Sequence, residues 1–160
     1  MTLDTSANEE HVRRLLRKAF AGVECPKAFK QADACGPVSH EVALQLRKNF
    51  YDYEPEEIHY LLPYVLEDMM NTRTGDDIET QDAERLVLQL DPLRLDNSLV
   101  RVNLLNQLAG FTPQQAEAIC EWLRMARTWN DLTMFTDWVD ASITYWCTRA
   151  TGAMNLKRSS

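Results

Sequence analysis

Glycine and proline are scarce in this chain, which has five Gly and six Pro among 160 residues. This scarcity argues against disorder and against a loop-rich β fold. No stretch approaches the roughly eighteen apolar residues that a membrane-spanning helix needs, and the first residues lack the features of a secretory signal. With 45% apolar residues, a chain of this length can bury one core. We therefore expect one soluble domain without a membrane span.

Closely spaced cysteines are also missing. The four cysteines lie at positions 25, 35, 120 and 147, and no C-x-x-C pair occurs. This spacing argues against a structural zinc site. An even count permits disulfides, but Cys120 and Cys147 fall within apolar helical stripes, where free buried thiols are common. We therefore predict reduced cysteines and a cytoplasmic location.

The chain lacks the short motifs of common enzymes. Neither a glycine-rich phosphate-binding pattern nor G-x-S-x-G occurs. His40-Glu41 begins like a zinc-protease motif, but Leu44 stands where the second histidine would be needed. The acidic run that begins at Asp76 lacks the loop pattern of a calcium-binding EF-hand. We predict no catalytic residue, no cofactor and no metal, and thus a protein that is not an enzyme.

One histidine keeps an enzymatic alternative open. His59 lies beside Glu56 and Glu57 and within a turn of Pro63, where a proline inside a helix favours a kink or a break. A broken helix exposes backbone groups, so His59 is the candidate for an acid–base or ligand role. A partly exposed helical histidine without chemistry is the default interpretation.

Helical periodicity dominates the apolar residues, which recur every three or four positions through most of the chain. This pattern predicts an all-α fold: one compact bundle of six or seven helices over residues 1–152, followed by a flexible tail at 153–160. No internal repeat is evident. The helices are expected near residues 12–20, 39–50, 55–69, 80–90, 97–108, 113–129 and 132–152.

Negative charge is concentrated in the middle of the chain. Residues 52–96 contain thirteen Asp and Glu but three Arg, a local net charge of −10 within a chain whose net charge is −7. Such a field repels nucleic acid and attracts basic proteins. We therefore predict a basic protein partner and no nucleic acid. The acidic residues expected to face this partner are Glu56, Glu57, Asp68, Asp76, Asp77 and Glu79.

The last two predicted helices carry apolar residues on two faces each. A helix of this kind is either central to its domain or committed to a partner. Trp and Tyr supply many binding hot spots, so the second faces are also candidates for a partner interface or for a homodimer through these helices. The aromatic candidates are Trp122, Trp129, Trp138 and Tyr145.

Three groups of residues resemble a family of small bacterial all-helical proteins of unknown function over about residues 15–125. The first is Ala19-Phe20-x-x-Val23-x-x-Pro26 followed by Cys35, and the second is Tyr60-x-x-Pro63. The third is Phe111-Thr112-Pro113-x-Gln115-x-x-Ala118-Ile119-x-x-Trp122-Leu123. The resemblance implies a bacterial helical domain, and it implies neither an activity nor a catalytic residue.

These observations favour a binding protein over an enzyme. The first hypothesis is a bacterial immunity or antitoxin-type protein that neutralises a basic toxin or effector by direct binding. The alternative is an adaptor or inhibitor, encoded by a phage or its host, that uses the same physical principles on another protein. A second alternative is a small enzyme with its site near His59.

Overall fold

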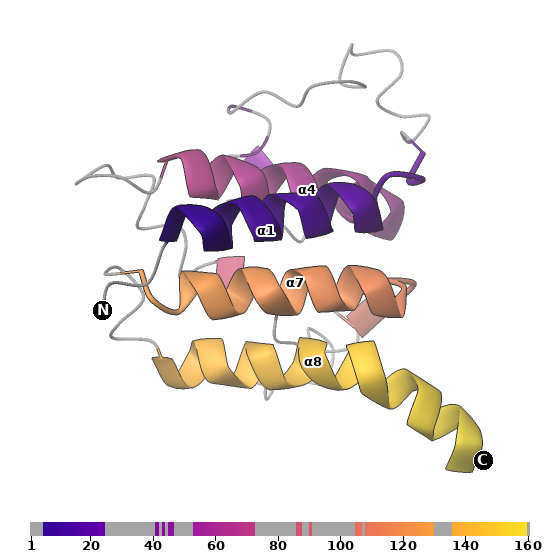
Figure 1. Cartoon of the computed structure of the whole chain (residues 1–160). Coiled ribbons are helices and arrows are strands. Elements are labelled where there is room, and N and C mark those ends of the chain that lie inside the picture. The colour runs from indigo at the N-terminus through magenta and orange to yellow at the C-terminus, as the bar shows by residue number, and fades with distance from the viewer. Residues whose placement is uncertain are drawn as a thin grey trace.

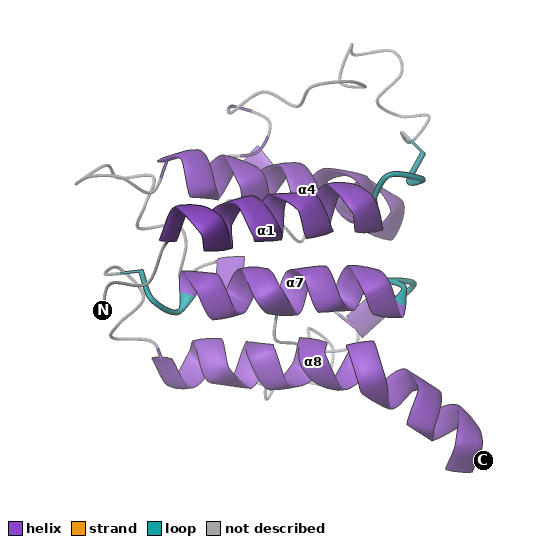
Figure 2. Cartoon of the chain, in the orientation of Figure 1, coloured by secondary structure: helices purple, strands orange, loops and turns teal. Residues whose placement is uncertain are grey.

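The computed structural model describes residues 5–24, 41, 43, 45, 46, 53–72, 86, 87, 90, 105, 106, 108–129 and 136–159. Within these residues the chain consists of helices and their connecting turns, and no strand occurs (Figure 2). The all-α prediction is therefore confirmed.

Four helices have defined ends in the described part of the chain: α1 (Thr5–Ala19), α4 (Pro55–Thr72), α7 (Pro113–Ala126) and α8 (Thr136–Ser159). The expected number of six or seven is not supported. The other three helices were expected at 39–50, 80–90 and 97–108, and most of these residues lie outside the described part. The positions described there as helical are 41, 43, 45, 46, 86, 87, 105 and 106.

The four helices lie along one common direction, with α4 beside α1, α7 against α1, and α8 against α7 (Figure 1). Neighbours run antiparallel. Arg13 contacts Asn71 and Arg17 contacts Glu67, so α1 and α4 run in opposite directions. None of the described helices is both long and apolar enough to cross a membrane.

α1 begins earlier than the sequence pattern predicts, at Thr5 rather than Val12. Its buried face carries Val12 and Leu16, and the buried ring of Phe20 follows in the turn after the helix. The helix ends at Ala19, within one residue of the expected end at position 20. The chain turns at once because Val23 N donates to Phe20 O at 3.1 Å.

A kink or a break was predicted at Pro63, and α4 continues through this residue without a break. A proline inside a helix costs about 3 kcal/mol. Each large apolar side chain that is fully buried contributes about 1.5–3 kcal/mol. Leu61 and Leu62 before the proline and Val65 and Leu66 after it are all completely buried. Packing on both sides of Pro63 therefore outweighs the local penalty.

α4 and α7 start in the same way, although the sequence suggests no repeat. α4 begins with Pro55-Glu56-Glu57 directly after Tyr53-Glu54, and α7 begins with Pro113-Gln114-Gln115 directly after Phe111-Thr112. In both helices, the side chain of the third residue accepts a hydrogen bond from the backbone N–H of the residue before the proline. Glu57 Oε1 accepts from Glu54 N at 2.8 Å, and Gln115 Oε1 accepts from Thr112 N at 2.9 Å. The buried positions after the start have matching spacing, namely Ile58, Leu61, Leu62 and Val65 in α4, and Ala116, Ile119, Cys120 and Leu123 in α7.

Two tryptophans in the core hold the helices in register. Trp122 Nε1 donates to Leu66 O at 3.0 Å, which joins α7 to α4. Trp146 Nε1 donates to Leu90 O at 2.8 Å, which joins α8 to the turn at Leu90. Both rings are completely buried. Each indole N–H therefore has the partner that a buried polar group requires.

α8 runs through Gly152 to Ser159, so the helix end predicted near Gly152 is too early. A glycine inside a helix costs only about 1 kcal/mol. The tail expected at 153–160 is helical up to Ser159, and the helix extends past the end of its neighbour α7 (Figure 1).

Cys120 of α7 and Cys147 of α8 form a disulfide, with Cα atoms 5.5 Å apart. The prediction of reduced cysteines is therefore wrong for this pair. The two apolar stripes that contain these cysteines face each other, which brings the sulfurs together at a spacing typical of disulfides. Cys25 and Cys35 lie outside the described residues.

Candidate binding surface on helices α1 and α4

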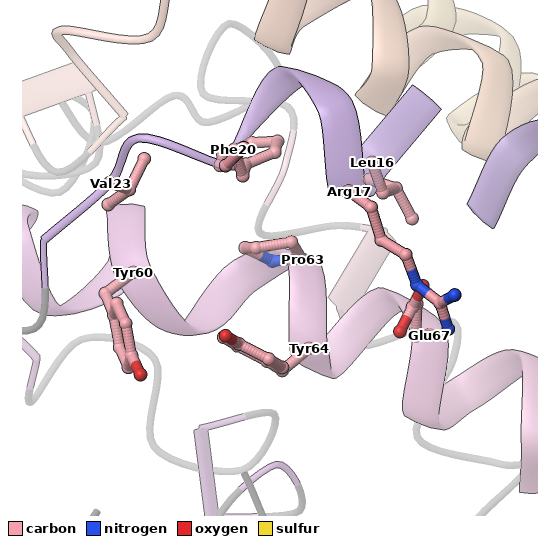
Figure 3. A pocket seen from close by; sticks show the side chains of 9 residues that line it. Leu16, Arg17, Phe20, Val23, Tyr60, Pro63, Tyr64 and Glu67 are labelled. Atoms are coloured by element: carbon pink, nitrogen blue, oxygen red, sulfur yellow. The ribbon is translucent and has the colours of Figure 1, made fainter. Parts of the chain in front are cut away.

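A cavity of about 180 Å³ lies between the C-terminal end of α1 and the middle of α4. In Figure 3, Phe20 and Val23 lie on the α1 side, Tyr60 and Tyr64 on the α4 side, and Arg17 approaches Glu67 at one end. The complete lining is Leu16, Arg17, Phe20, Ala21, Val23, Tyr60, Pro63, Tyr64 and Glu67. The walls are thus mostly aromatic and aliphatic.

Tyr64 is the exposed aromatic residue of this lining. Its side chain is 36% exposed, and the buried Tyr60 packs beside it with ring centroids 5.5 Å apart. Partial burial raises the pKa of the Tyr64 hydroxyl above its ordinary value of 10.0, with smaller contributions from Tyr60 and from the negative charge of Glu67. Tyr64 therefore stays neutral over the physiological pH range.

An ion pair closes one end of the cavity. Arg17 Nε donates to Glu67 Oε1 at 2.9 Å, with the arginine largely exposed and the glutamate mostly buried. The opposite charges compensate each other at this point. The cavity wall therefore presents no unbalanced charge from this pair.

α4 supplies carboxylates on both sides of the cavity and contains no Lys or Arg. Glu56 is exposed, whereas Glu57 and Asp68 are half-buried. Glu57 is partly occupied as the cap of its own helix, because it accepts from Glu54 N. Of the six acidic candidates, three are therefore placed on α4, while Asp76, Asp77 and Glu79 lie outside the described residues.

The aromatic candidates of the last two helices are placed differently from one another. Trp122 is completely buried and Trp129 is 5% exposed, and their rings meet edge to face at 5.4 Å. Both belong to the core, so neither side chain is accessible to a partner. Trp138 is 37% exposed and Tyr145 is half-buried. Tyr145 lies under the guanidinium of Arg149, 5.7 Å from the ring centroid.

His59 joins three helices instead of lining an open site. Its Nε2 is 2.7 Å from Oε1 of the buried Gln115, and its ring stacks on Phe111 at 4.2 Å. Since an amide oxygen can only accept, Nε2 donates in this contact. Gln115 Nε2 in turn donates to Ala19 O at 3.2 Å. The chain also approaches the His59 ring at Gly110, whose φ of +87° favours glycine.

No group of three potential metal ligands occurs among the described His, Cys, Asp and Glu residues. The pairing of Tyr60 with Tyr64 is the feature that sequence reasoning missed. The signal was available, because the two tyrosines lie four positions apart on α4 and add a second face to a helix that already has an apolar one. The sequence did not reveal that the C-terminal end of α1 lies across the cavity from these two tyrosines.

Comparisons of the chain with protein-family models, with curated proteins and with solved structures found no match. The resemblance to small bacterial helical proteins therefore stays a prediction.

Proposed function

We propose that the chain is a non-enzymatic binding module that captures a basic protein through the outward side of α4 and the cavity beside it. The observation that carries this proposal is the exposed ring of Tyr64 on a helix whose charged residues are all acidic. An aromatic group beside a cavity supplies contact area, and carboxylates around it speed the approach of a positive partner.

An immunity or antitoxin-type role is the biological form that we propose. Neutralising a toxin requires fast association and a partner surface that is occupied completely, and the net charge of −7 supports the first requirement. An adaptor or inhibitor that acts on another protein is the alternative, and the identity of the captured partner distinguishes the two. A homodimer through α7 and α8 stays a separate prediction.

The disulfide changes what we expect of the cellular location. The cytoplasm was expected from reduced cysteines, whereas the Cys120–Cys147 disulfide favours an oxidising compartment.

For the enzymatic alternative at His59, the described contacts instead support a structural role, because the His59 ring is packed on Phe111 and hydrogen-bonded to Gln115.

Affinity capture of the tagged full chain from its host, at about 50 mM and about 500 mM salt, tests the proposal. We expect one stoichiometric basic partner that is weakened at high salt. The double variant Glu56→Gln and Glu57→Gln should recover less of it. Glutamine at position 57 keeps the helix cap, since Gln115 makes the equivalent bond in α7.

The control removes the same amount of charge elsewhere, through Glu117→Gln in α7 and Asp137→Asn in α8, both exposed. It should recover as much partner as the unmodified chain. If the α4 variant and the control behave alike, or if salt has no effect, then α4 is not the surface that attracts the partner.

A further inference from the structure

The cavity between α1 and α4 suggests which residue of the partner is recognised, provided that the proposed function holds. We infer that it receives one aromatic or branched aliphatic side chain, presented by a peptide segment with basic residues next to it. This inference deepens the proposed function, because it names the anchor and not only the charge of the partner.

The size of the cavity fits such an anchor. Its volume is about 180 Å³. An engineered apolar cavity of about 150 Å³ in another protein stays free of water and binds benzene. A phenylalanine ring or a leucine side chain therefore has room between α1 and α4, whereas a tryptophan would require the walls to move.

The chemistry of the walls favours an uncharged anchor. Phe20, Tyr60 and Tyr64 offer three aromatic rings, and Leu16 and Val23 add aliphatic surface. The one cation of the lining, Arg17, is already paired with Glu67. A charged anchor would lose water without gaining an unpaired partner at this ion pair, which costs free energy. An apolar anchor avoids that loss.

The surroundings favour basic residues next to the anchor. α4 has two carboxylates before Tyr60, Glu56 and Glu57, and no positive side chain, whereas Glu67 after Tyr64 is balanced by Arg17. On α1, Arg14 is paired with Glu10, and Arg13 donates to Asn71 near the end of α4, away from Glu56 and Glu57. A segment with lysines next to an apolar residue therefore complements both the cavity and the carboxylates that precede it on α4.

Three synthetic peptides separate the two elements of the inference. The first has phenylalanine between two lysine pairs (KKFKK), the second replaces the phenylalanine by alanine (KKAKK), and the third replaces the lysines by glutamates (EEFEE). Binding to the full chain is followed by NMR at the methyl groups of Leu16 and Val23 in the cavity. Val139, a buried residue of α8, serves as the remote reference.

We expect KKFKK to shift the Leu16 and Val23 signals, to leave Val139 unchanged and to bind at least about tenfold more tightly than KKAKK. EEFEE should also bind more weakly than KKFKK. Equal binding of KKFKK and KKAKK would refute the anchor but leave capture by charge intact. Equal binding of KKFKK and EEFEE would instead contradict the proposed function, and an absence of binding by KKFKK would refute the anchor.

A cavity-filling variant supplies the second test. Ala21 is exposed and lines the cavity, so Ala21→Leu narrows it without disturbing the core. Ala141→Leu makes the same change at an exposed position of α8. We expect Ala21→Leu to weaken KKFKK about tenfold or more, and Ala141→Leu to have no effect. If both variants bind KKFKK equally well, the peptide does not use the cavity and the inference is wrong.

Discussion

Replacing Gln115 by alanine should strongly destabilise the fold, although the substitution removes a single neutral side chain. Gln115 is 5% exposed and makes three hydrogen bonds to three different parts of the chain. Its Oε1 accepts from Thr112 N at 2.9 Å and from His59 Nε2 at 2.7 Å, and its Nε2 donates to Ala19 O at 3.2 Å. The side chain thus connects the end of α1, the start of α4 and the start of α7.

The size of the effect follows from these contacts. A typical hydrogen bond contributes about 0.5–1.5 kcal/mol net, and a buried group left without a partner costs about 1–3 kcal/mol. Thr112 is exposed, so water can replace the partner of its N–H. The imidazole of His59 and the carbonyl of Ala19 are less accessible to solvent. We therefore expect a loss of about 2–4 kcal/mol, which is a large share of the 5–15 kcal/mol of a typical domain.

Urea unfolding measures this loss, since the free energy of unfolding falls linearly with denaturant. The matched control is Gln114→Ala, which truncates the exposed glutamine one position earlier and should change stability by less than about 0.5 kcal/mol. Gln115→Glu should lie between them, because it keeps both acceptor contacts but cannot donate to Ala19 O. If Gln115→Ala and Gln114→Ala unfold at the same urea concentration, the three hydrogen bonds do not stabilise the fold.

Three further predictions concern the disulfide and two titrating groups. The double substitution of Cys120 and Cys147 by alanine should lower the free energy of unfolding by about 3–4 kcal/mol, a value that follows from the 27-residue separation of the pair. The intact mass of the unmodified chain should be lower under non-reducing conditions than after reduction, by the two hydrogen atoms of these thiols. Tyr64 should titrate above pH 10.0 by ultraviolet absorbance, since burial raises its pKa. The contribution of the neutral hydroxyl to stability is complete below pH 10.0 and is lost as pH rises through the folded-state pKa, so Tyr64→Phe should remove this pH-dependent loss. The Asp140 carboxyl should titrate below 3.8 by NMR, because its hydrogen bond with Arg127 lowers its pKa; the small stabilisation is present above 3.8 and lost as pH falls, and Arg127→Gln should raise the pKa toward 3.8.

Local signals were sufficient to predict where α4 and α7 begin. The helix expected from residue 113 begins there as α7, because Thr112 followed by Pro113 is typical of a helix start, and the structure has a complete capping box at this point. The acidic start of α4 at Pro55 was predicted in the same way. Signals of this kind act within a few residues, so they can be recognised without knowledge of the neighbouring helices.

Errors arose where distant residues decide the outcome. The proline rule predicted a kink or a break at Pro63, and the helix does not break, because the residues on either side are buried to a depth that the sequence does not reveal. Cys120 and Cys147 were assigned as free thiols because each lies in an apolar stripe, and their pairing depends on the crossing of α7 and α8. The face of α7 that carries Trp122 was ambiguous for the same reason, because the partner of its indole N–H is a carbonyl of α4.

The burial of Trp122 changes where a partner can be sought. With Trp122 and Trp129 in the core, α7 has few large apolar groups left for a second molecule, whereas α4 presents Tyr64 beside a cavity. α7 packs against both α1 and α8, so most of its surface is already used within the domain. The outer side of α4 is where exposed aromatic surface, negative charge and a cavity coincide in the described chain. A surface that combines these three features discriminates between partners by shape and by charge, whereas shape alone or charge alone would allow many partners to bind.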